Sequence, residues 1–227
     1  MERSRILEAF ASERCSAILR TNRADAVAPA MEAAISGGFR IVEFTLTTPD
    51  ALRHIRDFSR HDELLVGAGT VLSVREAEAA LQAGASFVVS PVTDIEVIGW
   101  CKANHIVCIP GTYTPTEMLA AHRAGADMVK LFPAPADLPG YIRACKGPLP
   151  FLRIFPTNGV TPENAAQVLA AGAFGVGFVN NLFAPEDLAA GRYTAVYERA
   201  RAMVAAVRAA AGTPAAPAAP QPLAAHH

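Results

Sequence analysis

The stretch AGADMVKLFP, residues 124–133, combines the two signals that decide the fold of this chain. Ala-Gly-Ala is typical of the end of a helix, because glycine readily adopts the left-handed conformation that follows the last turn. The apolar run MVKLFP comes next, and it is short and continuous, as expected of a strand that is buried on both faces. The stretch therefore predicts a helix that ends and a parallel strand that begins directly after it.

The same junction recurs along the chain. Ala-Gly-Ala returns at residues 83–85 and 171–173, and Ser-Gly-Gly at residues 36–38 has the same form. Each junction precedes an apolar run, and other runs lie between them, so that the chain has eight: CSAILR (15–20), IVEFTL (41–46), LLVGAG (64–69), FVVSP (87–91), IVCIPG (106–111), MVKLFP (128–133), FLRIFPTN (151–158) and FGVGFV (174–179). A unit of two helices and two strands thus repeats about four times.

The segments between the runs carry signals for the start of a helix. A threonine suited to the N-cap precedes a proline suited to the first helical position at Thr48-Pro49, Thr114-Pro115 and Thr161-Pro162. The spacing of a capping box occurs twice, in Ser73 with Glu76 and in Thr114 with Glu117. Helices are therefore expected between the strands.

Eight strand–helix units predict a single (β/α)8 TIM barrel over residues 1–212, preceded by a helix at about residues 3–13. An open, doubly wound sheet is the alternative, and such a sheet more often has about five to seven strands. Residues 213–227 are rich in proline and alanine, which predicts a flexible tail rather than another unit.

Composition narrows the class of protein. The 227 residues are 52% hydrophobic, which suits one α/β barrel, and the formal net charge of −1 argues against a nucleic-acid or membrane-surface partner. No apolar run reaches the roughly 18 residues of a membrane span, and residues 1–14 are charged and amphipathic, unlike a signal peptide. The four cysteines form no Cys-x-x-Cys pair, so free thiols, no metal site and a cytoplasmic location are expected.

Polar residues at the carboxyl ends of the predicted strands are the candidates for chemistry, because barrel enzymes place their active sites there. These residues are Arg20, Glu43, Thr45, Thr47, Thr70, Ser90, Thr112, Lys130, Thr157, Asn158 and Asn180. Only Glu43 and Lys130 ionise inside an otherwise apolar strand. Their strands are the second and the sixth, so the two side chains are expected to face each other across the mouth of the barrel.

Lys130 suits covalent chemistry. Burial lowers the pKa of an amine and leaves a nucleophile near neutral pH, which attacks carbonyl groups to form a Schiff base. The resulting iminium is an electron sink for making or breaking a C–C bond, and Glu43 is the candidate base. Two structural alternatives are an ion pair between Lys130 and Glu43, and a lysine that extends outward to solvent.

Several stretches resemble the 2-keto-3-deoxy-6-phosphogluconate (KDPG) and 4-hydroxy-2-oxoglutarate (KHG) aldolase family. They are IVEFTLTTP, VGAGTVLS, VVSP, IPGTYTPTE, MVKLFPA and FPTNGVTPEN, and the match covers about residues 15–200 in the same order. The resemblance implies a cytoplasmic class I aldolase on a (β/α)8 barrel, a homotrimer without metal or organic cofactor. Its small-molecule substrate would be a 2-oxo-4-hydroxy acid, which it would cleave to pyruvate and an aldehyde.

The resemblance also implies roles for individual residues. Lys130 would be the Schiff-base lysine, and Glu43 would act as acid and base through the substrate hydroxyl or a water. Thr70 and Pro91 would surround the pyruvate half of the substrate. The remaining substrate contacts implied are Phe132, as a packing wall, and Thr157.

This chain departs from the family pattern at three places. Thr47 stands where sugar-acid members often have the arginine that holds the pyruvate carboxylate, and Arg20 is expected to supply that charge instead. Asn158-Gly159 replaces two glycines in the phosphate loop after the seventh strand, and Val179-Asn180 replaces a Gly-Ser pair after the eighth. Glycine-rich turns bind phosphate through closely approaching backbone N–H groups. A weakened preference for phosphorylated substrates is therefore predicted.

Two other functions remain open at this stage. One is a different phosphate-binding barrel enzyme, such as an isomerase or a synthase. The other is a non-catalytic paralogue that serves as a binding module, which the altered arginine and phosphate positions would fit. The presence of both Glu43 and Lys130 favours the lyase.

Overall fold

A computed structural model describes residues 2–211, and the tail expected at residues 213–227 lies outside the described part. The strands are β1 (Cys15–Leu19), β2 (Ile41–Thr45), β3 (Leu65–Gly69), β4 (Phe87–Val89), β5 (Val107–Ile109), β6 (Gly111–Thr112), β7 (Val129–Leu131), β8 (Ile154–Pro156) and β9 (Val176–Phe178). The helices are α1 (Arg3–Glu13), η1 (Ala24–Ala26), α2 (Val27–Ser36), α3 (Ala51–Phe58), α4 (Val74–Gln82), α5 (Ile95–Ala103), α6 (Pro115–Ala124), α7 (Leu138–Lys146), α8 (Pro162–Ala170), α9 (Pro185–Ala189) and α10 (Tyr193–Ala211). Within residues 2–211, no helix is long and apolar enough to cross a membrane.

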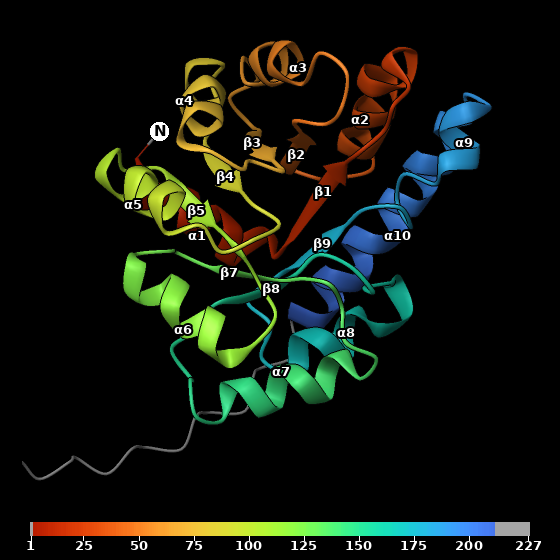
Figure 1. The fold of residues 1–227 in the computed structure, drawn as a ribbon. Coiled ribbons are helices and arrows are strands. Elements are labelled where there is room, and N and C mark those ends of the chain that lie inside the picture. The colour runs from red at the N-terminus through yellow and green to blue at the C-terminus, as the bar shows by residue number, and fades with distance from the viewer. Residues whose placement is uncertain (1, 212–227) are drawn as a thin grey trace, which may run out of the picture.

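The strands form a closed parallel barrel surrounded by helices (Figure 1). One sheet has the order β5-β4-β3-β2-β1-β9 and the other has the order β6-β7-β8. β5 and β6 are the two halves of the fifth predicted strand, separated at Pro110, which has no N–H to donate to the ladder. The two sheets meet again between β8 and β9, where the N–H of Phe174 donates to the carbonyl of Ile154 at 2.8 Å. The predicted (β/α)8 barrel is confirmed, and the open sheet is excluded.

The predicted helix ends are confirmed. Glycine adopts a positive φ after α2, α4, α6 and α8, at Gly38 (114°), Gly84 (101°), Gly125 (113°) and Gly172 (105°). Each glycine lets the chain leave its helix and turn into the next strand. The capping box of Thr114 with Glu117 is also present. The barrel strands are therefore delimited by local chemistry.

One predicted helix start is wrong. Thr48-Pro49 does not open α3, which begins at Ala51 with Asp50 at its N-cap. Thr48 is buried, and its hydroxyl donates to the carbonyl of Leu19 at 3.3 Å. A tertiary contact with the end of β1 thus takes the hydroxyl that local capping would have used.

Helix α1 closes the amino-terminal end of the barrel. Its Phe10 is fully buried and packs edge-to-face on Phe87 and on Phe155, with ring centroids 5.1 and 5.6 Å away. Ile6 joins the same cluster of side chains inside the barrel. The predicted helix at residues 3–13 is confirmed, and it leaves the carboxyl ends of the strands as the open mouth.

Candidate active site

Lys130 lies in the middle of β7, and its side chain is inside the barrel with 4% exposure. The Nζ atom lies 5.1 Å from the centroid of the Phe132 ring. Burial lowers the pKa of Lys130, the positive charge of Arg20 lowers it further, and the charge of Glu43 opposes the shift. The lysine therefore does not extend to solvent, and its environment favours the neutral, nucleophilic amine.

Glu43 lies in β2, on the opposite side of the barrel, with 2% exposure. Its carboxylate approaches Gly69 so closely that a Cβ at that position would lie 1.8 Å from Oε1. Oε1 is buried without a hydrogen-bond partner, and among residues 2–211 no ion pair within 4.0 Å joins Glu43 to Lys130. Burial raises the pKa of Glu43, against the charges of Lys130 and Arg20. This carboxyl group is unpartnered rather than locked in a structural ion pair.

A pocket of about 80 Å³ opens above Lys130 at the mouth of the barrel. Its lining comes from the carboxyl ends of β1, β7, β8 and β9 and consists of Ile18, Arg20, Lys130, Phe132, Thr157, Asn158, Val179 and Asn180. Thr157 has a buried hydroxyl without a hydrogen-bond partner. Within residues 2–211, three buried side-chain atoms have no hydrogen-bond partner, and two of the three belong to Glu43 and Thr157. Buried polar groups of this kind are satisfied by a bound molecule or water.

Arg20 and Thr70 meet at the rim of this pocket. The Nη2 group of Arg20 donates to the hydroxyl of Thr70 at 3.3 Å. Thr70 follows β3 with a φ of 58°, a left-handed conformation that is strained for a β-branched residue. Such strain costs on the order of 1–3 kcal/mol and is found mostly at functional sites.

Five predicted site residues lie outside the lining of this pocket. Two of them are Glu43 and Thr70, and the other three lie in the loops around it. Thr47 is exposed, with its hydroxyl 3.1 Å from that of Thr45. Pro91 packs on Gly111, where a Cβ would lie 2.2 Å from the Pro91 carbonyl oxygen. Gly159 has a φ of 71°, and its N–H donates to Asn158 Oδ1 at 2.9 Å. Thr47, Pro91 and Gly159 therefore lie in the loops that surround the pocket.

Two apolar residues of the pocket, Ile18 and Val179, were not among the candidates. Neither side chain is polar, so neither matches the pattern expected of a residue that takes part in chemistry. Ile18 lies two residues before Arg20, so the alternation of side chains along a strand was a signal that places both on the inner face. Val179 lies beyond the end of β9, and its signal was the Gly-Ser pair of the family pattern, which Val179-Asn180 replaces.

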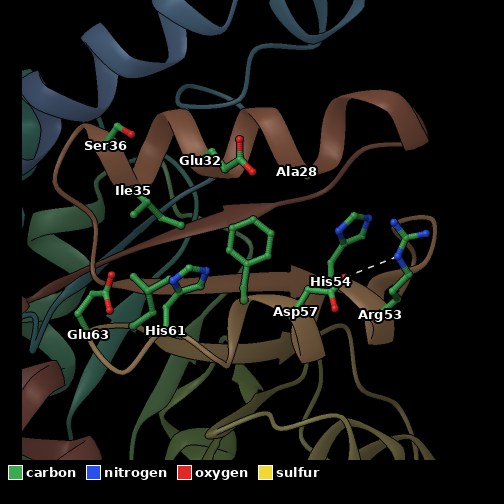
Figure 2. Close-up of a pocket in the computed structure, with 11 residues that line it drawn as sticks. Ala28, Glu32, Ile35, Ser36, Arg53, His54, Asp57, His61 and Glu63 are labelled. Carbon is green, nitrogen blue, oxygen red and sulfur yellow. Dashed lines mark ion pairs between the residues drawn. The ribbon is translucent and has the colours of Figure 1, made fainter.

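A larger hollow of about 410 Å³ lies between α2 and α3, on the outside of the barrel (Figure 2). It is lined by side chains such as Glu32, His54 and His61, and no strand end contributes to it. It holds neither Lys130 nor Glu43, so it is not the candidate active site. Among residues 2–211, no group of three or more His, Cys, Asp or Glu side chains is placed to hold a metal ion.

Comparisons with known proteins show the family of this chain. The family model for KDPG and KHG aldolases matches residues 6–197. The 2-dehydro-3-deoxy-6-phosphogalactonate aldolase of Escherichia coli K12 is 37% identical over 170 residues, which are 74% of this chain and 83% of that protein. The chain therefore belongs to the KDPG and KHG aldolase family, whose members are carbon–carbon lyases.

Two solved structures resemble the chain closely in fold. One is a KDPG aldolase from Legionella pneumophila with pyruvate captured as a covalent carbinolamine intermediate. It has a TM-score of 0.78 and 25% identity and covers 87% of this chain and 97% of its own. The other is a cube-shaped protein cage designed by fusing symmetric oligomeric domains. It has a TM-score of 0.79 and 35% identity and covers 87% of this chain and 73% of its own.

Replacing Glu43 by glutamine should stabilise the protein increasingly as the pH rises. Burial raises the pKa of Glu43 in the folded chain above its unfolded value. The contribution of Glu43 to the free energy of unfolding is therefore fully present below the ordinary carboxyl pKa of about 4.3, and it is lost as the pH rises through the raised pKa of the folded chain. Glutamine does not ionise, so the Tm of Glu43→Gln should gain on that of the wild type between about pH 4 and neutrality.

Thermal unfolding at several pH values measures this difference. Glu78 is exposed on α4, so Glu78→Gln serves as the control and should show no such gain. Parallel Tm curves for the wild type and Glu43→Gln would mean that Glu43 is ionised equally easily in the folded and unfolded chains.

Proposed function

We propose that this protein is a class I aldolase that cleaves 2-oxo-4-hydroxy acids to pyruvate and an aldehyde through a Schiff base on Lys130. The observation that carries the proposal is a buried amine with a lowered pKa at a pocket, inside a barrel that also buries a carboxyl group with no structural partner. A neutral amine attacks a carbonyl carbon, and a free carboxyl group moves protons.

The reaction begins when the Lys130 amine attacks the C2 carbonyl of the substrate to form a carbinolamine. Loss of water produces an iminium. Removal of the proton from the C4 hydroxyl then breaks the C3–C4 bond, and the bonding electrons move into the iminium to form an enamine. The aldehyde leaves, C3 takes up a proton, and hydrolysis of the new iminium releases pyruvate and restores the amine.

Glu43 is the proposed acid and base of this sequence. Its carboxylate accepts the C4 hydroxyl proton directly or through a water, and the same group returns a proton to C3. The raised pKa that burial imposes on Glu43 suits both steps, because an acid–base group works best with a pKa close to the working pH.

The remaining residues are proposed to bind the substrate. Arg20 is at the rim of the pocket, so its guanidinium can hold the carboxylate of the pyruvate half in place of the arginine that Thr47 replaces. Phe132 forms a wall beside Lys130, and the unpartnered hydroxyl of Thr157 is available for a substrate oxygen. Substrate contacts at the pyruvate end are completed by Thr70 and Pro91, and those at the distal end are Asn158, Gly159 and Asn180.

Reduction with borohydride in the presence of pyruvate should attach a lactyl-sized group to the peptide that contains Lys130. Lys130→Ala should lose both the adduct and the cleavage of substrate while its far-ultraviolet circular dichroism is unchanged. Lys146→Ala is the matched control, since burial also lowers the pKa of Lys146 but its Nζ donates to the carbonyl of Leu152 at 2.8 Å, away from the pocket. Mass spectrometry that finds the adduct on another lysine would overturn the mechanism.

The distal end of the pocket supports a weak preference for phosphorylated substrates. The N–H of Gly159, one of the backbone groups that would bind a phosphate, donates to the side chain of Asn158 at 2.9 Å. Hydrogen bonds to charged groups contribute about 1.5–3 kcal/mol each. A backbone N–H that already bonds to Asn158 is not free to bind a phosphate, so the preference for a phosphorylated substrate over an unphosphorylated one should be small.

We expect the values of kcat/KM for 2-keto-3-deoxy-6-phosphogluconate and 4-hydroxy-2-oxoglutarate to differ by less than about two orders of magnitude, which corresponds to about 2.8 kcal/mol. Asn158→Gly frees the N–H of Gly159 and should raise the preference for the phosphorylated substrate. A wild-type preference above about 10⁴, at 1.4 kcal/mol for each factor of ten, would show that side chains have rebuilt the phosphate site.

We also propose that the protein is a cytoplasmic homotrimer. Apolar side chains are exposed between the ends of three neighbouring strands and the first turns of the helices that follow, and they are Leu72 (51%), Val92 (50%), Ile95 (54%) and Tyr113 (39%). Clustered exposed apolar groups are typical of protein interfaces. The resemblance to the family suggests three copies, and the related cage was built from symmetric oligomeric domains. The four cysteines are free and buried, which fits a reducing compartment.

Sedimentation should give three times the chain mass of 23.9 kDa. The double variant Leu72→Glu/Ile95→Glu should sediment as a single chain, because two buried carboxylates at an interface are unfavourable. Phe151 is equally exposed but precedes β8 at the other end of the barrel, so Phe151→Glu should remain trimeric. A single-chain mass for the wild type at micromolar concentration would contradict this proposal.

A further inference from the structure

The distal end of the pocket lies above a seam in the barrel. β8 and β9 belong to different sheets, and the backbone hydrogen bond that links them, from the N–H of Phe174 to the carbonyl of Ile154, lies at their amino-terminal ends, away from the mouth. The loop after β8 contributes Asn158 to the pocket, and the loop after β9 contributes Asn180. No strand pairing joins β8 to β9 at this carboxyl end within residues 2–211, so side-chain contacts between the two loops help to set their spacing.

Asn181 spans the two loops. Its Nδ2 group donates to the carbonyl of Val160, which is 1% exposed. The loop after β8 is in turn tied to α8, because Asn164 Nδ2 donates to the carbonyl of Gly159 at 2.8 Å. Thr161 N–H donates to Asn164 Oδ1, also at 2.8 Å. The wall that contains Asn158 is thus fixed to a helix on one side and to Asn181 on the other.

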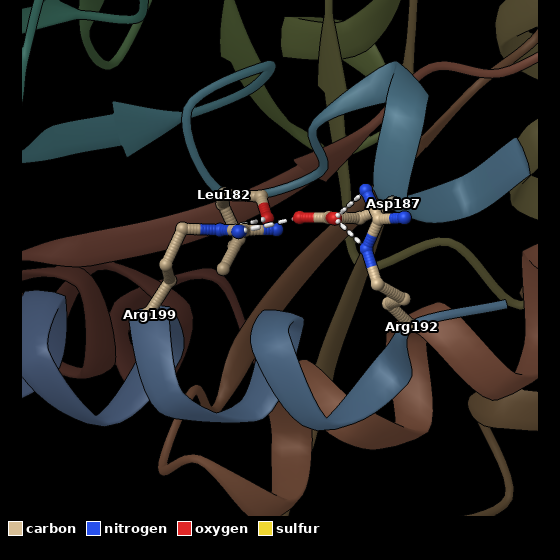
Figure 3. A network of polar contacts seen from close by, with 4 residues as sticks. All are labelled: Leu182, Asp187, Arg192 and Arg199. Atoms are coloured by element: carbon tan, nitrogen blue, oxygen red, sulfur yellow. Dashed lines mark hydrogen bonds and ion pairs between the residues drawn. The ribbon is translucent and has the colours of Figure 1, made fainter. Parts of the chain in front are cut away.

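Arg199, from α10, holds the loop after β9 (Figure 3). Its Nε group donates to the carbonyl of Leu182 at 3.1 Å, and its Nη1 lies 2.6 Å from an Asp187 oxygen. The other Asp187 oxygen lies 2.6 Å from Arg192. Asp187 is 7% exposed, and of its two arginine partners Arg199 is the less exposed, at 30% against 53% for Arg192.

The carbonyl of Leu182, which Arg199 holds, lies two residues after Asn180 of the pocket lining. The carbonyl of Val179 accepts hydrogen bonds from the N–H groups of Leu182 and Phe183, at 3.1 and 2.8 Å. Leu182 and Phe183 are both buried. The segment therefore forms a closed turn with Asn180 near its start, and a shift of the Leu182 carbonyl would carry Asn180 with it.

We propose that Asn181 and Arg199 are positioning residues that hold the two mouth loops together across the seam and so set the fit of the distal group of the substrate. This inference rests on the proposed aldolase function. Neither side chain lines the pocket; both act through the loops that carry Asn158 and Asn180. Arg192 shares Asp187 with Arg199 but makes no hydrogen bond to Leu182, so it is the matched control.

The test separates the distal half of the substrate from the pyruvate half. Asn181→Ala and Arg199→Met should lower kcat/KM for 4-hydroxy-2-oxoglutarate by roughly 10- to 100-fold, the effect of a small misplacement of binding groups. The exchange of pyruvate methyl protons with solvent and the borohydride adduct on Lys130 should stay within about twofold, because pyruvate has no distal group. Arg192→Met should keep the cleavage rate within about threefold.

Arg199→Lys distinguishes positioning from charge. Lysine keeps the positive charge beside Asp187 but lacks the planar fork with which arginine bonds the carboxylate and the Leu182 carbonyl together. Cleavage by Arg199→Lys should remain at least about fivefold slower than in the wild type, as for a residue whose geometry matters. If any Arg199 variant fails to fold, as judged by circular dichroism, Asn181→Ala decides the question.

Two results would overturn the positioning role. One is an equal loss of cleavage and of pyruvate exchange, which indicates general damage. The other is unchanged cleavage of 4-hydroxy-2-oxoglutarate in Asn181→Ala. Both are distinct from failure of the proposed function, in which the wild type itself forms no pyruvate adduct on Lys130.

Discussion

The burial of one amine and one carboxyl group inside an apolar barrel is the constraint on which the rest of the site depends. Removing a charge from water is costly, so both Lys130 and Glu43 are shifted toward their neutral forms. A close ion pair would have cancelled the two shifts, but no such pair is present within residues 2–211. The barrel keeps the two groups apart, on strands that face each other, and each remains available for a substrate.

The two ends of the barrel divide stability from chemistry. At the amino-terminal end, Phe10 fills the interior against the rings of Phe87 and Phe155, and the packing is apolar. At the mouth, polar atoms lack partners and Thr70 adopts a strained conformation. Natural proteins often place such unfavourable features at functional sites, where well-packed regions elsewhere offset them.

The seam between β8 and β9 gives the outer helices a part in the site. Most of the mouth is positioned by strand pairing, since parallel ladders fix where each strand ends. At the mouth end of the seam no strand pairing is present within residues 2–211, and Arg199, Asp187 and Asn181 support the loops there with side-chain bonds. A residue in α10 can therefore influence the pocket without touching it.

The sequence by itself determined the barrel, because its signals are local. Buried runs predict strands, and a glycine after each helix, as at Gly125, ends that helix by backbone conformation alone. The sequence also singled out Lys130 and Glu43, since an ionisable residue within an apolar run is conspicuous in any context. The same local logic went wrong at Thr48, whose hydroxyl bonds to Leu19 instead of capping α3.

The tertiary structure alone decided how these residues combine. The absence of an ion pair between Lys130 and Glu43, the contact of Arg20 with Thr70, and the clamp of Arg199 on Leu182 join residues that are distant in the chain. Each depends on distances of a few ångströms that the closure of the barrel sets. Periodicity and capping do not encode such distances, because they describe neighbours along the chain and not neighbours in space.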